Sequence, residues 1–573
     1  MDKVRENQDK VKENQQQSKE EVQHNVVNNL YWRSCRRDDQ AAVRALYINR
    51  EIDSIYGLEE TGLLDDFFHF LQERDIWSKV EKLNSPEIKR VMVSITQYVI
   101  LYMEKVIYGI KYMDSLEELL FSDQSAMRLV GFNAHQVKEG VCQRGSWRRK
   151  DKDRIGPITP ESLANNLVKI PVRQMENFFN NCIKSLARAK TFPKELRVVI
   201  DATDIETKPD FPGAGSVTRE KKIVDKTGRI KTIEVTVWGF KLIALFAVGV
   251  KIPIAIKVVQ IQRHESNFTQ ALIKTAKENL GHYSKITELM ADRAFLDGET
   301  LWWLHKTMNI RFVVPVKNGM HIKEDARQIA KLGGSEVCFK RRTKTVTRGT
   351  GKEAYTEQIV TEVYGVSQLN TYAAYGPPEH AKNQNKKSFT PNPINALVVT
   401  QWENHNYGWD KSKVLVTDLE VSQDPYVAFD GYDERSIIEN SLFRQTKQSL
   451  HLKYPIKKTK EGMHLNLLFT MSIFALMNAY RQWTEKQYSM IKNGQECGLE
   501  RFWKKLKAEN RSKVIIFTND VYGIIDVAEC MILLNVKVKD FGDMEAARNE
   551  ILKRWNLLNP MTDQGSLTPP PSL

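Results

Sequence analysis

One charge-rich stretch of the chain brings together residue types that could grip a charged substrate. The stretch GYDERSIIENSLFRQTK, from Gly431 to Lys447, places Tyr432, Arg435 and Glu439 at separations of three and four residues. On a helix turning about 100° per residue, these three side chains fall within an arc of about 60°. An acid flanked by a cation and a phenol is either a surface ion pair or one edge of a substrate site.

Two β-like runs earlier in the chain each stop at an aspartate. RVVID ends at Asp201 and ELMAD ends at Asp292. If both strands belong to one sheet, these acids could converge with Glu439 at the edge of that sheet. Each acid also has a purely structural interpretation, as a turn former, a helix N-cap or half of a surface ion pair. Asp204 and Asp297 stand close enough in sequence to be alternatives to the first two.

Three clustered carboxylates imply a cation, because they repel one another unless positive charge lies between them. Oxygen ligands without His or Cys select Mg²⁺ or Mn²⁺. Two such ions stabilise both the attacking and the leaving oxygen of a phosphoryl displacement. The pattern therefore favours metal-dependent cutting and joining of nucleic-acid strands.

The composition agrees with a polyanionic partner. The 573 residues include 85 Lys and Arg against 71 Asp and Glu, a net charge of +14. A surplus of this size most often serves binding to nucleic acid. The six scattered cysteines form no CxxC pair, so the sequence predicts neither a disulfide framework nor a zinc cluster.

One segment is long and apolar enough to imitate a membrane span. MHLNLLFTMSIFALMNAYRQW runs from Met463 to Trp483, but His464, Asn466 and Asn478 interrupt it. An apolar helix within a large basic protein is more often a buried core helix. We therefore expect a core helix, no association with a membrane, and a cytoplasmic location.

The hydrophobic patterns divide the chain into a helical part and a mixed part. Apolar residues recur at three- and four-residue spacing up to about residue 190, which is typical of helices. From Leu196, a β-run, two long strands hinged near Gly249 and alternating helices and strands predict a mixed sheet with helices on its faces. Short β-like runs and basic turns follow, and helical character returns at Asp433.

Four blocks in this order resemble the insertion-sequence transposases of the Asp-Asp-Glu type. They are VVIDATDI, the long β-pair that ends before HESNFTQAL, then MADRAF, and finally YDERSIIENSLFRQTK. The last block is similar to the branch with a Tyr-Arg-Glu-Lys signature on the helix of the third acid. The resemblance implies a ribonuclease H-like core that is interrupted by a β-rich insertion before that helix.

The resemblance also implies roles for individual residues. Asp201, Asp292 and Glu439 would be catalytic and would bind two Mg²⁺ or Mn²⁺ ions. Tyr432 and Arg435 stand at the family's spacing from Glu439 and would contact DNA phosphates, which suits a phenol and a bidentate guanidinium.

The lysine of the signature matches less cleanly. The family places six residues between the Glu and the Lys, but seven lie between Glu439 and Lys447. On a regular helix Lys447 stays within about 80° of Glu439, and Arg444 is the alternative phosphate-binding residue. The family's insertion often offers an aromatic residue to a displaced base, so Trp402 and Trp409 are base-stacking candidates, although a Trp in a β-run is usually part of a core.

With this resemblance, we expect an α/β fold whose mixed sheet belongs to a ribonuclease H-like core. Six parts are expected along the chain. They are a charged, flexible arm (1–28), a helical N-terminal region that binds DNA (29–190), the first part of the core (191–318), the β-rich insertion (319–430), the second part of the core (431–486), and a C-terminal region with a disordered tail (487–573).

The leading hypothesis is a cut-and-paste DNA transposase. It would bind transposon-end DNA and target DNA as a homodimer on paired ends, within the nucleoid of a prokaryotic cytoplasm. Two alternatives stay open, because a fold does not by itself determine an activity. One is a catalytically silent, regulatory DNA-binding derivative, and the other is a ribonuclease H-like nuclease that cuts DNA without joining it.

Overall fold

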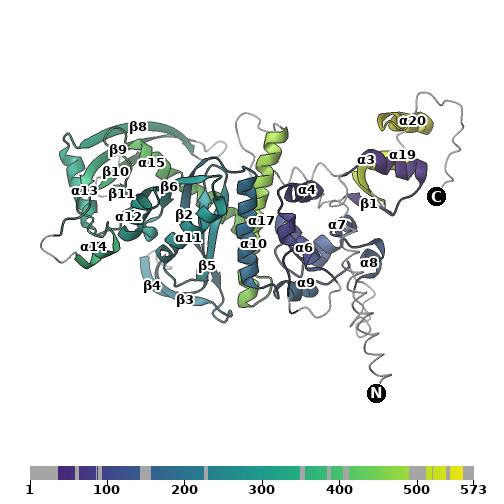
Figure 1. The fold of residues 1–573 in the computed structure, drawn as a ribbon, viewed down its shortest axis with the longest axis horizontal. Helices are drawn as coiled ribbons and strands as arrows, with labels where there is room; N and C mark the ends of the chain where they lie inside the picture. The colour runs from purple at the N-terminus through teal and green to yellow at the C-terminus, as the bar shows by residue number, and fades with distance from the viewer. Residues whose placement is uncertain are drawn as a thin grey trace, which may run out of the picture. The chain divides into compact units, whose positions relative to one another are not determined.

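The computed structural model of the protein divides into two compact units. The sheet unit comprises Ile183–Gln448, and the helical unit comprises Met1–Cys182 with Ser449–Leu573 (Figure 1). The predicted arm (1–28) and the tail after residue 558 lie outside the described residues. The structure describes residues 37–58, 64–85, 87, 93–141, 156–224, 230–348, 355–383, 389–403, 412–488, 502, 512–518, 521–536 and 543–558.

The sheet unit is built on one large mixed sheet, which confirms that part of the prediction. Its strand order is β3-β4-β2-β6-β7-β11-β10-β9-β8, and β5 also pairs with β4. The central strand β2 is antiparallel to β4 and parallel to β6, which is in turn parallel to β7. The strands are β2 (Glu195–Thr207), β3 (Gly215–Val224), β4 (Ile230–Ala247), β5 (Ile252–Gln260), β6 (Lys285–Ala291), β7 (Arg311–Pro315), β8 (Val337–Arg348), β9 (Tyr355–Leu369), β10 (Ile394–Glu403) and β11 (Lys413–Thr417).

The sequence of β2 suits the centre of a sheet. Val198, Val199 and Ile200 are fully buried and β-branched, as expected for a strand covered on both faces. β4 pairs with three strands: residues 238–247 pair with β2, residues 230–239 with β3, and residues 240–247 with β5. The predicted pair of long strands is therefore present as β4 and β5.

The strands of the predicted insertion continue the same sheet. β11 pairs antiparallel with β7, so β8 to β11 extend the sheet beyond its parallel strands. The description of this part as short β-runs and loops is incomplete, because it also contains the helix α13 (His321–Leu332). Ile322, Ala326 and Ala330 are buried at four-residue spacing, a helical period that sequence analysis overlooked.

Helices pack against several strands of this sheet. α11 contacts β4, β5 and β6, α13 contacts β9, β10 and β11, and α15 contacts β6 and β7. The helical elements of the sheet unit are η3 (Glu265–Phe268), α11 (Thr269–Leu280), η4 (Arg293–Phe295), α12 (Gly298–Lys306), α13, α14 (Pro378–Asn383), α15 (Tyr426–Asp433), η7 (Ile438–Phe443) and α16 (Arg444–Gln448).

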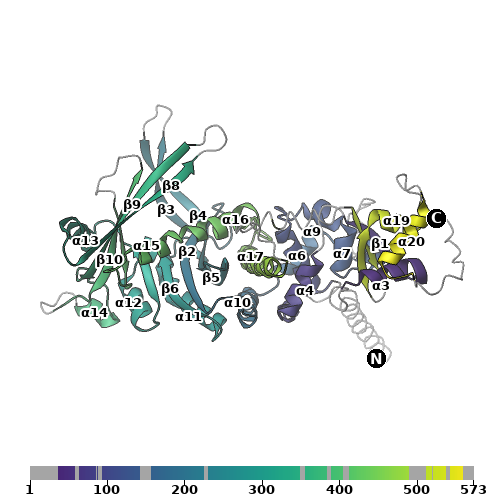
Figure 2. The ribbon, with the colours of Figure 1, turned by 90° about the horizontal axis from the view of Figure 1, so that it is seen from above.

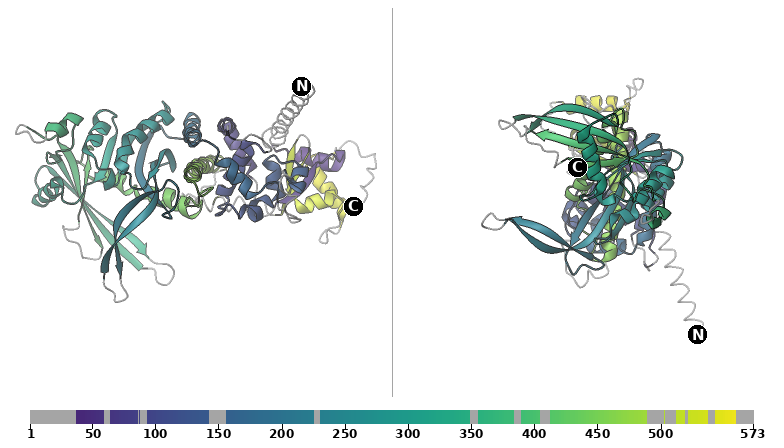
Figure 3. Two further views of the ribbon diagram at one scale, coloured as in Figure 1. Left: turned by 90° about the horizontal axis from the view of Figure 1, so that it is seen from below. Right: turned by 90° about the vertical axis from the view of Figure 1, so that its left-hand side faces the viewer.

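Two long β-hairpins project from the sheet. They are β3–β4 and β8–β9, and both extend to the same side of the unit (Figure 2). The right-hand view of Figure 3 shows them diverging from each other. The β8 strand carries exposed cations, including Arg341 and Lys344, which suits an edge strand that must avoid pairing with other chains.

The helical unit contains the long apolar helix α17 (Lys460–Tyr488). Its segment Lys460–Thr484 is long and apolar enough to cross a membrane, but 94% of its most apolar window is buried within the protein. Its polar residues have partners there: the Tyr102 hydroxyl donates to Asn466 Oδ1 at 2.6 Å, and Asn466 Nδ2 donates to the Leu452 carbonyl. This burial and pairing are typical of a core helix.

The N-terminal and C-terminal segments meet in a small sheet of their own. β1 (Ser54–Leu58), β12 (Lys513–Phe517) and β13 (Tyr522–Asp526) pair antiparallel in the order β1-β12-β13. The N-terminal region was expected to be helical, but it also contains the strand β1. The helical elements of this unit are α3 (Asp39–Arg44), η1 (Ala45–Asn49), α4 (Asp65–Glu73), α5 (Trp77–Val80), α6 (Ile95–Ile107), η2 (Glu117–Phe121), α7 (Gln124–Leu129), α8 (Ala134–Glu139), α9 (Pro160–Leu167), α10 (Val172–Arg188), α17, α19 (Val527–Leu533) and α20 (Met544–Arg554).

Candidate active site

Two parallel strands place Asp201 and Asp292 beside each other. In the register of β2 and β6, Ile200 is paired with Ala291, so the next residue on each strand is an aspartate. Neighbouring strands lie about 4.8 Å apart, and paired residues point to the same face of a sheet. The register therefore brings together two acids that are 91 residues apart in the sequence (292 − 201).

Asp201 does not end its strand, contrary to the sequence-based expectation. β2 continues to Thr207 because its later residues pair with the long strand β4. β6 does end at Ala291, immediately before Asp292. The backbone N–H of Ala202 donates a hydrogen bond of 2.8 Å to Asp201 Oδ1, which orients that carboxylate.

The acidic neighbours that could have replaced these aspartates have other partners. Asp204 forms an ion pair with Arg219 at 2.6 Å. Asp297 is the N-cap of α12 and accepts a hydrogen bond from the backbone N–H of Thr300. Asp292 precedes η4, yet its side chain makes no capping hydrogen bond. Asp201 and Asp292 are thus the pair that the strand register joins.

Glu439 lies on a π-helical segment and not on a regular α-helix. α15 ends at Asp433, a turn follows, and the π-helix η7 begins at Ile438. The expectation of one uniform helix through Tyr432, Arg435 and Glu439 is therefore wrong. Single π-helical turns are rare and occur frequently at functional sites.

Arg435 joins the acids of two different elements. Its Nη1 atom lies 3.1 Å from Asp201 Oδ2 and 2.9 Å from Glu439 Oε1. Only 19% of the Arg435 side chain and 13% of the Asp201 side chain are exposed, whereas Glu439 is 55% exposed. The guanidinium carbon also lies 5.9 Å from the centre of the Tyr432 ring. The structure thus brings the expected Tyr, Arg and Glu to the strand that carries Asp201.

The titration of this cluster reflects burial among like charges. The pKa of Asp201 is raised to about 6, mainly by burial and also by the charges of Glu439 and Asp292, although the Ala202 amide and Arg435 lower it. Burial also raises the pKa of Tyr432, and the charges of both aspartates act in the same direction. For Arg435, burial lowers the pKa, but the surrounding Tyr and carboxylates outweigh it and raise it above the ordinary value.

The donor chemistry of the cluster fits a hard divalent cation. Its acids offer only oxygen ligands, and they lie near enough to perturb one another. Among the described residues, however, no three acidic, His or Cys side chains are arranged to hold a metal ion. Arg435 Nη1 stands between two of the carboxylates and supplies the positive charge that they require.

Close packing behind the cluster fixes α15 against β6. A Cβ atom on Gly431 would lie 2.5 Å from Oε1 of the buried Glu288 on β6, so a larger residue would have to displace that carboxylate. Glu434, next to Arg435, accepts a 2.7 Å hydrogen bond from Arg197 of β2. Sequence analysis missed these residues, because nothing local signals which glycine or glutamate meets a distant strand.

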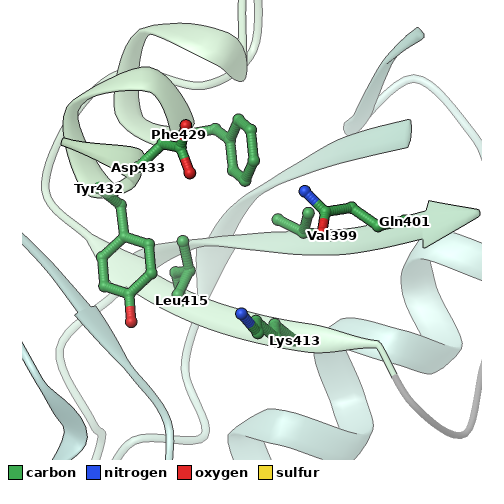
Figure 4. A pocket seen from close by; sticks show the side chains of 7 residues that line it. All are labelled: Val399, Gln401, Lys413, Leu415, Phe429, Tyr432 and Asp433. Atoms are coloured by element: carbon green, nitrogen blue, oxygen red, sulfur yellow. The ribbon is translucent and has the colours of Figure 1, made fainter. Parts of the chain in front are cut away.

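A small pocket adjoins the cluster at Tyr432. Alternate residues of β10 and β11 form its floor, and α15 forms its wall, with a cavity of about 100 Å³. Figure 4 shows the Phe429 and Tyr432 rings extending from the helix toward the two strands. The lining residues are Val399, Gln401, Lys413, Leu415, Phe429, Tyr432 and Asp433. The lining thus combines two aromatic rings with an amide and an ammonium group.

The two tryptophan candidates are only partly placed. Trp402 belongs to β10, directly after Gln401, and its backbone pairs with Val360 of β9. Trp409 lies outside the described residues. The two cations after Glu439 both fall on α16, where Arg444 is exposed and Lys447 is partly buried. Arg444 Nε donates to Gln448 Oε1 at 3.3 Å.

Comparison with known proteins agrees with this geometry. No curated protein matches the chain significantly. The family model described as the transposase DDE domain matches residues 192–461. This range begins just before β2 and contains Asp201, Asp292 and Glu439. Residues 192–461, somewhat less than half of the chain, are therefore similar to the transposase DDE domain.

Proposed function

We propose that the protein is a DNA transposase that cleaves the ends of its element and joins them to target DNA. The observation that carries this proposal is the meeting of acids from three separate elements. Asp201 and Asp292 come from in-register strands, and Arg435 links Asp201 to Glu439 on η7. Such an arrangement suits metal-dependent displacement at a phosphodiester.

We assign the core of the sheet unit to the ribonuclease H-like fold. The supporting observation is the order β5-β4-β2-β6-β7, in which β4 is antiparallel to its neighbours while β2, β6 and β7 run parallel. In this assignment β8 to β11 are the β-rich insertion, and η7 and α16 return the chain to the core.

Asp201, Asp292 and Glu439 would hold two Mg²⁺ or Mn²⁺ ions. Bound there, such ions would activate the attacking oxygen and stabilise the leaving oxygen. In the first step, water attacks the phosphodiester at the transposon end, its proton passes to solvent, and a 3′-OH is released. In the second step, that 3′-OH attacks a target phosphodiester and displaces the 3′-oxygen of the target strand.

Tyr432 and Arg435 would hold the phosphate that is being attacked or its neighbour. Both side chains lie beside the carboxylates, and a guanidinium can contact two phosphate oxygens at once. Their hydrogen bonds would fix the scissile phosphate against the acids. This positioning accounts for much of the rate gain that such sites provide.

The π-helix favours Lys447 over Arg444 as the lysine of the signature. A π-helix closes its hydrogen bonds one residue farther along than an α-helix, so a turn of it contains about one extra residue. η7 lies between Glu439 and Lys447, where the spacing has one residue more than the family's. The extra residue is therefore taken up in η7, and Lys447 returns to the side of the acid.

The pocket beside Tyr432 would receive a displaced base, and Trp402 or Trp409 would be the residue that stacks on it. Stacking on aromatic rings is the usual way to hold a base outside a duplex. The remaining parts of the proposal follow the family: a homodimer on paired transposon ends, and action in the nucleoid of a prokaryotic cytoplasm, with no part of the chain in a membrane.

A strand-transfer assay tests the proposed function. The substrate is duplex DNA carrying the sequences that flank the coding region, incubated with a plasmid target and Mg²⁺. Asp201→Asn, Asp292→Asn and Glu439→Gln are expected to lose both cleavage and joining. Asp204→Asn and Asp297→Asn are the matched controls and should retain both, because Asn still accepts the hydrogen bond that caps α12.

The same assay separates the alternatives. Cleavage without joined product would indicate a nuclease, and DNA binding without cleavage would indicate a catalytically silent derivative. Equal loss of cleavage and joining in the site variants and in both controls would show that the three acids matter no more than their acidic neighbours. This result would overturn the proposed site.

A further inference from the structure

We propose that Arg435 is a resident cation that competes with divalent metal ions for Asp201 and Glu439, and that DNA promotes metal binding by drawing Arg435 away. This inference rests on the proposed function, because it assumes that these carboxylates bind metal. Arg435 is then a positioning residue, because the location of its guanidinium determines whether Asp201 and Glu439 can bind metal. It also predicts that metal and DNA bind cooperatively.

The competition follows from the geometry of a single nitrogen atom. Arg435 Nη1 lies within hydrogen-bond distance of one oxygen of Asp201 and one oxygen of Glu439. Oxygens that face this nitrogen cannot at the same time converge on a metal ion. In agreement, the described residues include no group of three such side chains arranged as metal ligands.

The position of Arg435 in the chain allows it to leave. It stands in the turn between α15 and η7, where backbone hydrogen bonds to Tyr432 and Ile438 hold its main chain, so only its side chain has to move. Its contact with Glu439 is open to solvent on the acid's side, because the Glu439 side chain is 55% exposed. A DNA phosphate offers a guanidinium two oxygens in a fork and is a strong competitor for it.

A neighbouring ion pair shows that this arrangement is specific to Arg435. Arg219 also pairs with an aspartate of β2, at 2.6 Å from Asp204, but it bridges to no second acid that the structure describes. An Arg219→Ala substitution removes a like charge that also pairs with β2, but it does not free the Asp201 carboxylate. It is therefore the matched control for Arg435→Ala.

Calorimetric titration of the full chain with Mn²⁺ alone tests the competition. Arg435→Ala is expected to bind Mn²⁺ about tenfold more tightly than the wild type, within the range of typical coupling between sites. Arg219→Ala should stay within about twofold of the wild type, since Arg219 pairs with Asp204 and not with Asp201, and an exposed charge is largely screened. Asp201→Asn combined with Arg435→Ala should lose the gain. Circular dichroism verifies folding, and Arg435→Gln, which keeps the hydrogen-bonding group without the charge, is the second variant if Arg435→Ala unfolds.

A second titration contains duplex DNA with the flanking sequences of the element. If DNA removes Arg435 from the carboxylates, wild type and Arg435→Ala should bind Mn²⁺ within about twofold of each other in its presence. An advantage of Arg435→Ala that persists undiminished with DNA would overturn the role of DNA.

The outcomes distinguish this inference from the proposed function. Mn²⁺ binding that Asp201→Asn does not affect would contradict the proposed metal site itself. Mn²⁺ binding that depends on Asp201 but is no tighter in Arg435→Ala or Arg435→Gln would overturn only the competition. An equal gain in Arg219→Ala would do the same, because it would reduce the effect to overall charge.

Discussion

The carboxylates of Asp201 and Asp65 have the same altered acidity but very different surroundings. Burial raises the pKa of each to about 6. Asp65 begins α4 and is 3% exposed, and its Oδ2 accepts a hydrogen bond from the buried Tyr522 hydroxyl of β13. Asp201 instead faces Arg435, through which it meets the exposed Glu439.

The contrast shows what separates a structural carboxylate from a candidate site. Asp65 is held by the Tyr522 hydroxyl and the Asp66 backbone, with the charge of Arg37 nearby, and it joins a helix to the small sheet. Asp201 and Asp292 share their surroundings with an acid from a third element, and Arg435 is the cation that pairs with Asp201 and with that acid. A raised pKa is therefore weak evidence alone and becomes informative when several elements direct charge to one accessible place.

Removal of divalent metal should separate the two regions most strongly. With EDTA in place of Mg²⁺, DNA cleavage should fall by about 10³-fold or more, because the ions supply several kcal/mol of stabilisation in the transition state. The Asp65→Asn protein should show the same metal requirement and a cleavage rate within about twofold of the wild type. DNA cleavage that persists in EDTA would show that Asp201, like Asp65, has a structural role and does not bind a catalytic metal ion.

A pH series of unfolding measurements should identify Asp65 as the destabilising acid. Its folded-state pKa of about 6 exceeds the ordinary 3.8, so between these values the folded state keeps a proton that the unfolded state has lost. The free energy of unfolding therefore falls as pH rises through this window. Asp65→Asn cannot ionise and still accepts from Tyr522, so it should be more stable than the wild type by about 2–3 kcal/mol at pH 8 and nearly equal to it at pH 4.

Urea denaturation at the two pH values measures this difference. Glu161→Gln is the control, because this acid also lies in the first turn of a helix, α9, but its side chain is exposed. A stability difference that is the same at pH 4 and pH 8 would show that ionisation of Asp65 is not its cause.

Loss of the Tyr432 hydroxyl should weaken DNA binding by about tenfold, the value of one hydrogen bond to a charged phosphate. The measurement is fluorescence anisotropy with labelled transposon-end DNA in Tyr432→Phe. The control is Tyr426→Phe on the same helix, whose hydroxyl donates to the Thr361 carbonyl at 2.7 Å. That variant should lose stability and keep its DNA affinity, and the reverse result would exchange the roles of the two tyrosines.

The smallest effect is expected from the cations of α16. Lys447→Ala should lower DNA affinity by about threefold and reduce the slope of log affinity against log salt by about one, as the loss of one phosphate contact does. Arg444→Ala should change both quantities less. A larger loss of DNA affinity in Arg444→Ala would indicate that Arg444, and not Lys447, is the lysine equivalent of the signature. In that case η7 does not compensate for the extra residue between Glu439 and Lys447.

The sheet was predictable from the sequence because its signals are local. The β-branched run before Asp201 and the long strands around Gly249 can be recognised from their composition. They are observed as β2, β4 and β5. The end of β2 could not be predicted, because its polar residues after Asp201 remain in the strand only through pairing with β4. α13 was missed since only Ile322, Ala326 and Ala330 mark its buried face.

The acids of the candidate site could be named in advance, but their relations could not. Strand ends and spacing singled out Asp201, Asp292 and Glu439, whereas the register of β2 and β6 depends on the whole sheet. The π-helix could not be predicted either, because one extra residue in a helical pattern gives no recognisable signal in the amino-acid composition. The bridge from Arg435 to Asp201 joins residues 234 apart, a contact that only the fold reveals.

The most direct test of the account is to locate Mn²⁺ by anomalous X-ray scattering in crystals of the protein with transposon-end DNA. The account predicts anomalous peaks in contact with carboxylate oxygens of Asp201, Asp292 and Glu439, with Arg435 on a DNA phosphate. Mn²⁺ bound elsewhere, with Arg435 still between Asp201 and Glu439, would contradict it.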